Sequence, residues 1–316
     1  MVERGSFKQL PPPRHVSRVT RVLLIDLLVE RSEFGHGGNQ EVVSPIAEGG
    51  SVEVLLLTPQ MQSEESGDRA QDEGVVPLSG EDVPNWDYEF PFWEECTLEM
   101  SGNEVVFRRV AMPLHGDDRL MTIWLERIGS DAVVCSGSRR NVTMWEGWMD
   151  GAASAMRCSS HMGVPTLGIC FGHQLLCKSL GADVERAESM SSGVWDLQLT
   201  EVGMSDVLFS SRRSGDDGAP VALYSHQDHV ISVPESCTLL GSADHNRVTA
   251  VRVNDKRGYP LPAWGVQFHP EAAKARVQRA FEWGHITGEE LASFQREHDG
   301  AGILSSFASV VRTNHS

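Results

Sequence analysis

The sequence predicts an α/β fold: a doubly wound, mostly parallel sheet flanked by helices, with a mixed or antiparallel extension. Three observations support this prediction. Continuous apolar runs of strand length, such as "RVLLIDLLV" at 21–29 and "VPTLGIC" at 164–170, are typical of strands buried on both faces. Amphipathic stretches of helical length separate such runs, and the alternation predicts repeated β-α-β units. Short strand-like stretches after residue 182 predict the extension.

The chain is expected to begin with a tail and one β-α-β unit. Residues 1–20 contain three consecutive prolines and are interpreted as an N-terminal tail. A strand at 21–29, a short helix at 39–47 and a second strand at 51–57 follow. The domain that these elements open is expected to extend over residues 21–290.

Residues 58–112 interrupt this alternation and are interpreted as an acidic insertion. Between Glu64 and Glu104 there are thirteen Asp or Glu residues and a single base, Arg69. A loop this long is unusual inside a compact domain, which favours an insertion over a connection. Its end predicts a hairpin around Ser101-Gly102-Asn103. Our hypothesis is that the insertion covers the mouth of a site or docks a partner.

The alternation resumes at residue 118 and continues to the C-terminal part. In order, the pattern predicts a helix at 119–129, a strand at 131–138, a helix at 143–161, a strand at 164–170 and a helix at 171–181. Helices are expected from about residue 271, and residues 291–316 are interpreted as a C-terminal helical tail.

Composition excludes several classes of function. The net charge of -17 disfavours a nucleic-acid partner. The first apolar run is only eight residues long, too short to span a membrane, so no membrane partner is expected. None of the six cysteines forms a C-x-x-C pair, which disfavours a metal site. We therefore expect a cytoplasmic protein with reduced thiols.

Cys170 lies between two glycines in "GICFG", where a buried apolar strand runs directly into an amphipathic helix. This is the arrangement of a nucleophile elbow, with sulfur in place of oxygen. The helix N-terminus would lower the thiol pKa. The backbone N–H of Phe171 would be free to face an oxyanion. Taken alone, the motif leaves open a buried small residue in a strand-to-helix turn.

The segment "WGVQFHPEAA" supplies a base and a group to orient it. A hydrophobic strand ends at His269, ninety-nine residues after Cys170, and Glu271 lies two positions further on. In an extended chain, residues two apart project to the same side. Glu271 can therefore accept a hydrogen bond from one imidazole nitrogen while the other nitrogen faces Cys170. A strand-end turn is the alternative for this motif alone.

The chain resembles the class I (triad) glutamine amidotransferases, and within them the stand-alone relatives of the GMP synthase glutaminase. The segments "GICFGHQLL" and "GVQFHPE" match the two catalytic motifs of that family, and "LYSHQDHV" (223–230) resembles its S-H-x-D-x-V segment. "VVCSGSRRNV" (133–142) stands where the family has its oxyanion loop. The resemblance implies a flavodoxin-like sheet and a reaction that needs no cofactor.

The resemblance also implies roles for individual residues. Cys170 resembles the nucleophile, His269 the base and Glu271 its partner. The remaining matched positions are two backbone oxyanion donors and four residues that hold the substrate: Phe171 and Ser138 for the donors, and Gln174, Ser225, Gln227 and Asp228 for the substrate.

Two positions depart from the family pattern. Ser138-Arg139 replaces the usual Gly-Pro of the oxyanion loop, and Arg140 follows, so this loop is either less rigid or a site for an anion. Gln227 stands where many members have glycine, which alters the shape of the pocket.

Three functions remain open from the sequence. The first is a glutaminase that hydrolyses the side-chain amide of glutamine and supplies ammonia to an ATP-dependent synthetase subunit in trans. The second is a free-standing γ-glutamyl hydrolase or peptidase that acts on a γ-glutamyl compound unaided. The third is a regulatory module without turnover, which the intact Cys170, His269 and Glu271 set disfavours.

Overall fold

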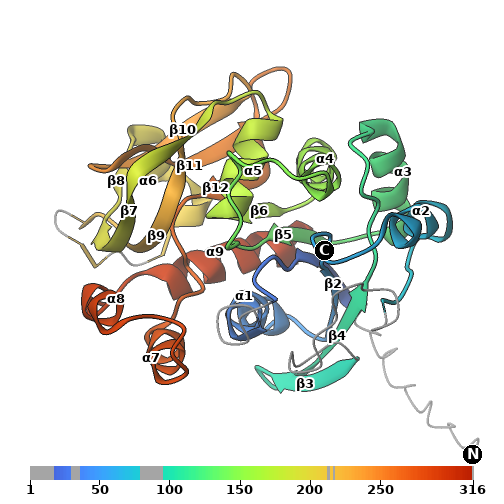
Figure 1. Ribbon diagram of the computed structural model, residues 1–316, viewed down its shortest axis with the longest axis horizontal. Coiled ribbons are helices and arrows are strands. Elements are labelled where there is room, and N and C mark those ends of the chain that lie inside the picture. The colour runs from blue at the N-terminus through green and yellow to red at the C-terminus, as the bar shows by residue number, and fades with distance from the viewer. Residues whose placement is uncertain (1–17, 30–35, 79–94, 212–213, 216–217, 315–316) are drawn as a thin grey trace, which may run out of the picture.

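A ten-stranded sheet forms the centre of the molecule in the computed structural model, which describes residues 18–29, 36–78, 95–211, 214–215 and 218–314 (Figure 1). The spatial order of its strands is β3-β4-β2-β1-β5-β6-β12-β11-β10-β8. Two more strands, β7 and β9, form a separate antiparallel pair among the described residues. The α/β fold class predicted from the sequence is confirmed.

Six neighbouring strands make up the parallel part of the large sheet. In spatial order they are β4 (Asn103–Val110), β2 (Val52–Leu57), β1 (Thr20–Ile25), β5 (Ala132–Cys135), β6 (Thr166–Ile169) and β12 (Pro260–Val266). Their carboxyl ends lie along one edge, where open α/β sheets bind ligands.

The antiparallel strands lie at the two ends of the large sheet and in the separate pair. They are β3 (Cys96–Met100), β11 (Asn246–Asn254), β10 (Cys237–Ala243) and β8 (Gln198–Leu199), with β7 (Val184–Asp196) and β9 (Val221–Val230) in the pair. All of these strands except β3 lie after residue 182, where the sequence predicts the mixed extension.

Helices cover both faces of the sheet (Figure 1). On β1, Val22 and Leu24 face a core with α1 and α9, whereas Leu23 and Ile25 face a core with α3, α4 and α5. The helices that form these layers are α1 (Gly38–Ala47) and α9 (Gly300–Asn314) on one face, and α3 (Asp118–Ile128), α4 (Trp148–His161) and α5 (Phe171–Ser179) on the other. The smaller helices are α2 (Glu64–Glu73), α6 (Glu201–Ser205), η3 (Val207–Phe209), α7 (Lys274–Glu282) and α8 (Gly288–Ser293).

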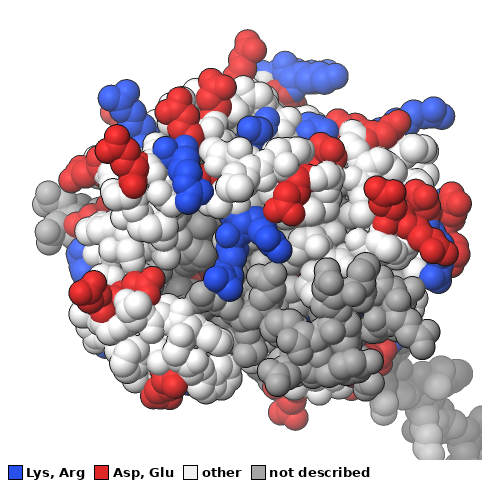
Figure 2. Space-filling model, viewed as in Figure 1, with Lys and Arg blue, Asp and Glu red and all other residues white. Residues whose placement is uncertain are grey.

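Part of the segment 58–112 belongs to the main sheet. Strand β4 pairs in parallel with β2, and β3 pairs with β4 in the expected hairpin, whose turn places Ser101 at φ 52° and Gly102 at φ 77°. Acidic side chains gather over α2, as Figure 2 shows. Residues 79–94 lie outside the described residues.

The structure differs from the sequence at one expected helix and adds a core contact at the expected C-terminal tail. The helix expected at 143–161 begins only at Trp148, because residues 141–147 form turns instead. At the other end, α9 places Ile303 and Phe307 in the same core as β1. The division into residues 1–20, 21–290 and 291–316 stays a prediction. Among the described residues, no helix is long and apolar enough to cross a membrane.

Candidate active site

Cys170 occupies a strained turn between β6 and α5. Its backbone has φ 50° and ψ -98°, a left-handed conformation that non-glycine residues rarely adopt and that costs roughly 1–3 kcal/mol. Close packing enforces the turn: a Cβ atom on Gly168 would lie 2.5 Å from the Gly172 carbonyl oxygen. A Cβ atom on Gly172 would lie 2.4 Å from the carbonyl oxygen of Cys135. The two glycines of the motif thus let helix, strand and neighbouring strand meet around Cys170.

His269 and Glu271 form an ordered pair just after β12. The backbone N–H of His269 donates to the Leu223 carbonyl at 2.8 Å, which joins this segment to β9. The imidazole Nδ1 lies 2.8 Å from Glu271 Oε1, and both side chains are largely buried. Burial alone would lower the pKa of His269, but the charges and hydrogen bonds of Cys170 and Glu271 outweigh it and raise this pKa well above 6.5. The geometry favours a protonated imidazole beside the sulfur.

The loop after β5 packs directly against His269. A Cβ atom on Gly137 would lie 2.8 Å from His269 Cε1, so only glycine leaves room for the ring. Ser136 Oγ accepts from the N–H of Leu27 and donates to the Gly137 carbonyl, both at 2.9 Å, and Ser138 Oγ accepts from the N–H of Arg140 at 3.0 Å. These bonds fix the segment that bears Ser138, the proposed second oxyanion donor.

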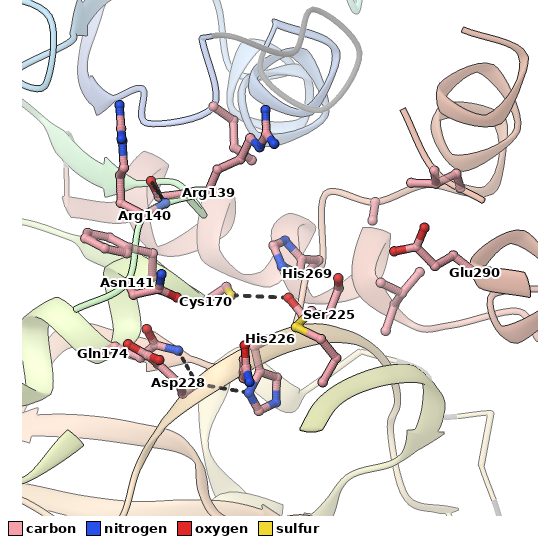
Figure 3. A pocket seen from close by; sticks show the side chains of 18 of the residues that line it. Arg139, Arg140, Asn141, Cys170, Gln174, Ser225, His226, Asp228, His269 and Glu290 are labelled. Carbon is pink, nitrogen blue, oxygen red and sulfur yellow. Dashed lines mark hydrogen bonds between the residues drawn. The ribbon is translucent and has the colours of Figure 1, made fainter. Parts of the chain in front are cut away.

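A cavity of about 370 Å³ opens at the carboxyl ends of β5, β6 and β12 (Figure 3). Eight of the nine residues selected from the sequence line it; they are Ser138, Cys170, Phe171, Gln174, Ser225, Gln227, Asp228 and His269. Glu271 is the ninth and is hydrogen-bonded to His269. Phe171 is the first residue of α5, where the backbone N–H has no acceptor within the helix.

The residues expected to hold the substrate contact one another or neighbouring residues of the site. The side-chain amide of Gln174 donates to the Asp228 carbonyl at 2.6 Å and to Gln267 Oε1 at 3.1 Å. Gln227 accepts from Arg186 at 2.6 Å and donates to the Ala187 carbonyl at 2.9 Å. The Ser225 carbonyl lies 3.8 Å from the sulfur of Cys170. These contacts build the pocket wall; roles in substrate binding stay predictions.

Asp228 connects this wall to the loop that contains Ser138. Its Oδ2 accepts from both the N–H and the hydroxyl of Thr143, at 2.9 and 2.7 Å, and the side chain is nearly fully buried. Its Oδ1 lies 3.6 Å from Arg186 on β7. The sequence did not predict the contacts with Thr143 or Arg186, because both depend on pairing between distant segments.

One missed residue did have a sequence signal. Gln267 precedes His269 by two positions, so an extended chain places both on the same side. Its side-chain amide lies 3.5 Å from the sulfur of Cys170 and is buried. By contrast, no sequence pattern indicated the apolar wall that α7, α8 and their flanks contribute, which consists of Val277, Ile286 and Phe294 beside Glu290.

Two other residues near the motifs, His173 and Cys177, are packed in the protein interior. His173 is fully buried, its Nε2 lies 3.0 Å from the Val248 carbonyl, and burial lowers its pKa to about 4. Cys177 is also fully buried, which raises its thiol pKa. The Nδ1 of His226 lies 3.1 Å from the Asp228 carbonyl oxygen. In the part of the chain that the structure describes, no three His, Cys, Asp or Glu side chains are grouped to hold a metal ion.

Comparison with known proteins adds independent findings. The family model "Glutamine amidotransferase class-I" matches residues 107–281. The chain is 40% identical over 113 residues to a GMP synthase [glutamine-hydrolyzing] of Clostridium kluyveri, which covers 35% of this chain and 19% of that protein. It is 33% identical over 144 residues to the Xanthomonas campestris protein of that name. This match covers 45% of this chain and 25% of that protein. The chain therefore spans about a fifth to a quarter of the length of these relatives.

A solved structure extends the similarity to the fold. A glutamine amidotransferase from Thermotoga maritima superposes with a TM-score of 0.56 at 16% identity, over 93% of this chain and 99% of that one. At this identity the likeness concerns the fold alone. It agrees with the α/β fold described above.

Proposed function

Since the chain belongs to the class I glutamine amidotransferase family, we propose that it hydrolyses the side-chain amide of glutamine through a thioester on Cys170. One observation supports this function above the others. The strained Cys170 turn and the His269–Glu271 pair come from motifs ninety-nine residues apart, yet both line or adjoin one cavity. A nucleophile, a base and a group that orients the base are the parts that covalent amide hydrolysis needs.

In the first half of the proposed reaction, the Cys170 thiolate attacks the amide carbon. A carbon–sulfur bond forms, and the N–H groups of Phe171 and Ser138 are proposed to hold the oxyanion, each contributing roughly 3 kcal/mol. The carbon–nitrogen bond then breaks, and the leaving nitrogen takes the proton of the His269 imidazolium. The raised pKa of His269 supports this role, because the proton is in place before attack.

In the second half, water hydrolyses the thioester. Neutral His269 takes a proton from the water, whose oxygen attacks the acyl carbon, and the carbon–sulfur bond breaks to return the thiolate. The products are glutamate and ammonia. We propose that the ammonia passes to an ATP-dependent synthetase on a separate protein. The similarity to GMP synthases supports this part of the proposal, although the chain spans only about a fifth to a quarter of their length.

A γ-glutamyl hydrolase that needs no partner is the second candidate. It is favoured by Arg139 and Arg140 in the lining of the cavity, because Ser138-Arg139 replaces the Gly-Pro of the family pattern and Arg140 follows. Assays of the purified chain distinguish the two functions. A synthetase subunit should hydrolyse glutamine weakly alone and faster with its partner, whereas a γ-glutamyl hydrolase should hydrolyse γ-glutamyl peptides unaided.

Replacing the sulfur tests both candidates. Cys170→Ala should lower amide hydrolysis at least about 10³-fold, because residues of a catalytic set act as a unit. Glutamate release measures this, and circular dichroism checks that the variant is folded. Cys96→Ala, on the outer strand β3, is the matched control and should keep wild-type activity. Full hydrolysis by Cys170→Ala would contradict the function proposed for this site.

A further inference from the structure

A buried side-chain amide lies beside the sulfur of Cys170 and has no role in the reaction proposed above. Gln267 Nε2 is 3.5 Å from Cys170 Sγ, within hydrogen-bonding range for sulfur, and the side chain is fully buried. Gln267 lies outside the cavity lining that the described residues form, so a substrate in the cavity would not touch it. Its contact with the reacting atoms is therefore the sulfur itself.

Backbone hydrogen bonds hold Gln267 in place at the end of β12. The N–H of Cys170 donates to the Val266 carbonyl at 2.8 Å, which joins the turn of the nucleophile to the residue before Gln267. The N–H of Gln267 donates to the Thr249 carbonyl on β11, also at 2.8 Å. Two positions further on, His269 is hydrogen-bonded to Cys170 as well, because alternate residues of an extended segment project to the same side. The strand end thus directs two side chains at the sulfur.

The pattern of hydrogen bonds determines which end of the Gln267 amide faces the sulfur. A backbone carbonyl can only accept, so the group of Gln174 that lies 2.6 Å from the Asp228 carbonyl is its NH2 group. The same NH2 group lies 3.1 Å from the Gln267 amide, whose oxygen therefore faces Gln174. That leaves the NH2 group of Gln267 for Cys170. The backbone of β9 thus fixes Gln267 as a hydrogen-bond donor to the sulfur.

The groups around the sulfur favour different protonation states. The Ser225 carbonyl, 3.8 Å from Cys170 Sγ, can only accept and therefore favours the S–H form (Figure 3). The Gln267 N–H and the His269 imidazolium are donors, so both favour the thiolate. An amide does not titrate as the imidazolium does, so the Gln267 donor is present at every pH at which the protein is folded.

We propose that Gln267 is a further catalytic residue that stabilises the Cys170 thiolate by a hydrogen bond to the sulfur, and that Gln174 is the positioning residue that orients it. This inference rests on the amide hydrolysis proposed for Cys170. No proton moves along the chain of amides. The sulfur accepts the Gln267 hydrogen bond while it is negatively charged, and the bond weakens when the charge passes to the oxyanion. It strengthens again when hydrolysis of the thioester returns the thiolate.

Alkylation of Cys170 by iodoacetamide, followed at that cysteine by mass spectrometry across a range of pH, tests the proposal without a substrate. Gln267→Met keeps the length of the side chain and removes the N–H. We expect the midpoint of its pH profile to lie about one pH unit above that of the wild type. This shift is the roughly tenfold loss of thiolate expected from losing a hydrogen bond to a charged group. A less stabilised thiolate is also more nucleophilic, so the plateau rate at high pH should rise roughly threefold.

A second variant and a matched control accompany this measurement. Gln174→Met removes the group that orients Gln267 and should shift the midpoint in the same direction by less, so it tests the proposal even if Gln267→Met does not fold. Gln62→Met is the control, because Gln62 is also buried and is bonded to the backbone of Met112, outside the cavity lining. It should keep the wild-type profile. Circular dichroism checks the fold of each variant.

The outcomes separate this inference from the proposed function. Unchanged alkylation profiles in folded Gln267→Met and Gln174→Met, or midpoints at lower pH, would overturn the inference and leave the proposed function standing. Slower glutamine hydrolysis by Gln267→Met with an unchanged alkylation profile would likewise overturn it, because it would indicate a purely structural role. A wild type that does not hydrolyse glutamine would contradict the proposed function, whereas the alkylation profiles would still decide whether Gln267 stabilises the thiolate.

Discussion

The cavity beside Cys170 has an inner part and an outer part that are built in different ways. The inner part consists of Cys170, His269 and Glu271 at the carboxyl ends of β6 and β12, where all three are mostly buried. The outer part consists of side chains from β7, β9, α7, α8 and the segment between β5 and α4, and its Arg186 and Met190 side chains are about half exposed. Close backbone packing holds the Cys170 turn of the inner part in place, whereas side-chain hydrogen bonds hold the segments of the outer part together.

This difference explains why the inner part is expected to determine the catalytic rate and the outer part the substrate preference. A nucleophile has to be held to within a fraction of an ångström, so it is placed on rigid elements with close backbone contacts. Substrate preference depends on side chains at the rim, which can change without disturbing the sheet. We therefore expect substitutions in the inner part to lower kcat strongly. Substitutions in the outer part should have smaller effects, mainly on specificity and loop position.

Gly172→Ala should produce the largest effect that comes from packing alone. The added methyl group would lie 2.4 Å from the Cys135 carbonyl oxygen, so the turn has to move. We expect kcat to fall at least about 100-fold, since an ångström of displacement at a catalytic group has that effect. Overpacking should also lower the free energy of unfolding by about 1–3 kcal/mol. Steady-state kinetics and chemical denaturation measure the two quantities.

Gly147→Ala is the matched control for this substitution. Gly147 has φ -56° and no heavy atom within 4 Å of the added methyl group, so kcat and stability should remain near wild type. Similar behaviour of the two variants would contradict the rigid, backbone-packed inner part.

The inner part is also the part that the sequence predicted. The turn at Cys170 and the pair of His269 and Glu271 each lie within one short segment, where strand-to-helix order and a spacing of two residues suffice. Local patterns also predicted most of the strands and helices, because buried parallel strands are continuous apolar runs. The meeting of the two motifs was inferred from the need of a cysteine nucleophile for a base and from the resemblance to a family, not from spacing.

Ser225, Gln227 and Asp228 of the outer part were selected from the sequence, but the contacts that hold this part together were not predictable, for a physical reason. Thr143 is in turns rather than a helix, and its N–H and hydroxyl both bind Asp228, eighty-five residues away. Arg186 meets Gln227 only because β7 pairs with β9. Such contacts depend on tertiary pairing, which overrides the local helix propensity of residues 143–147.

Glu271→Gln should have an intermediate effect and a specific pH signature. A hydrogen bond to a charged group contributes roughly 1.5–3 kcal/mol, so kcat/KM should fall roughly 10- to 100-fold. Glu271 is one of the groups that raise the His269 pKa well above 6.5. The imidazolium is the reactive form below that pKa and is lost as pH rises through it. Removing the carboxylate should therefore move the alkaline limb of kcat/KM to lower pH.

The comparison variant for Glu271 is Glu41→Gln. Glu41 is on α1 and pairs with Arg276 at 2.8 Å, outside the lining of the cavity, so its loss should leave the alkaline limb in place. An unchanged or higher alkaline limb in Glu271→Gln would rule out Glu271 as the group that stabilises the imidazolium.

Asp228→Asn should have the smallest effect of the series, because it loosens the outer part without touching the sulfur. The amide oxygen can still accept from the N–H of Thr143, but the negative charge that strengthens both bonds is lost. We expect kcat to fall about fivefold, which corresponds to about 1 kcal/mol in total for the two weakened bonds. Thr143→Val removes the hydroxyl, keeps the N–H, and should reproduce part of this loss. If Asp228 instead binds the substrate directly, Asp228→Asn would raise KM while Thr143→Val would not, and the split between KM and kcat decides between the two roles.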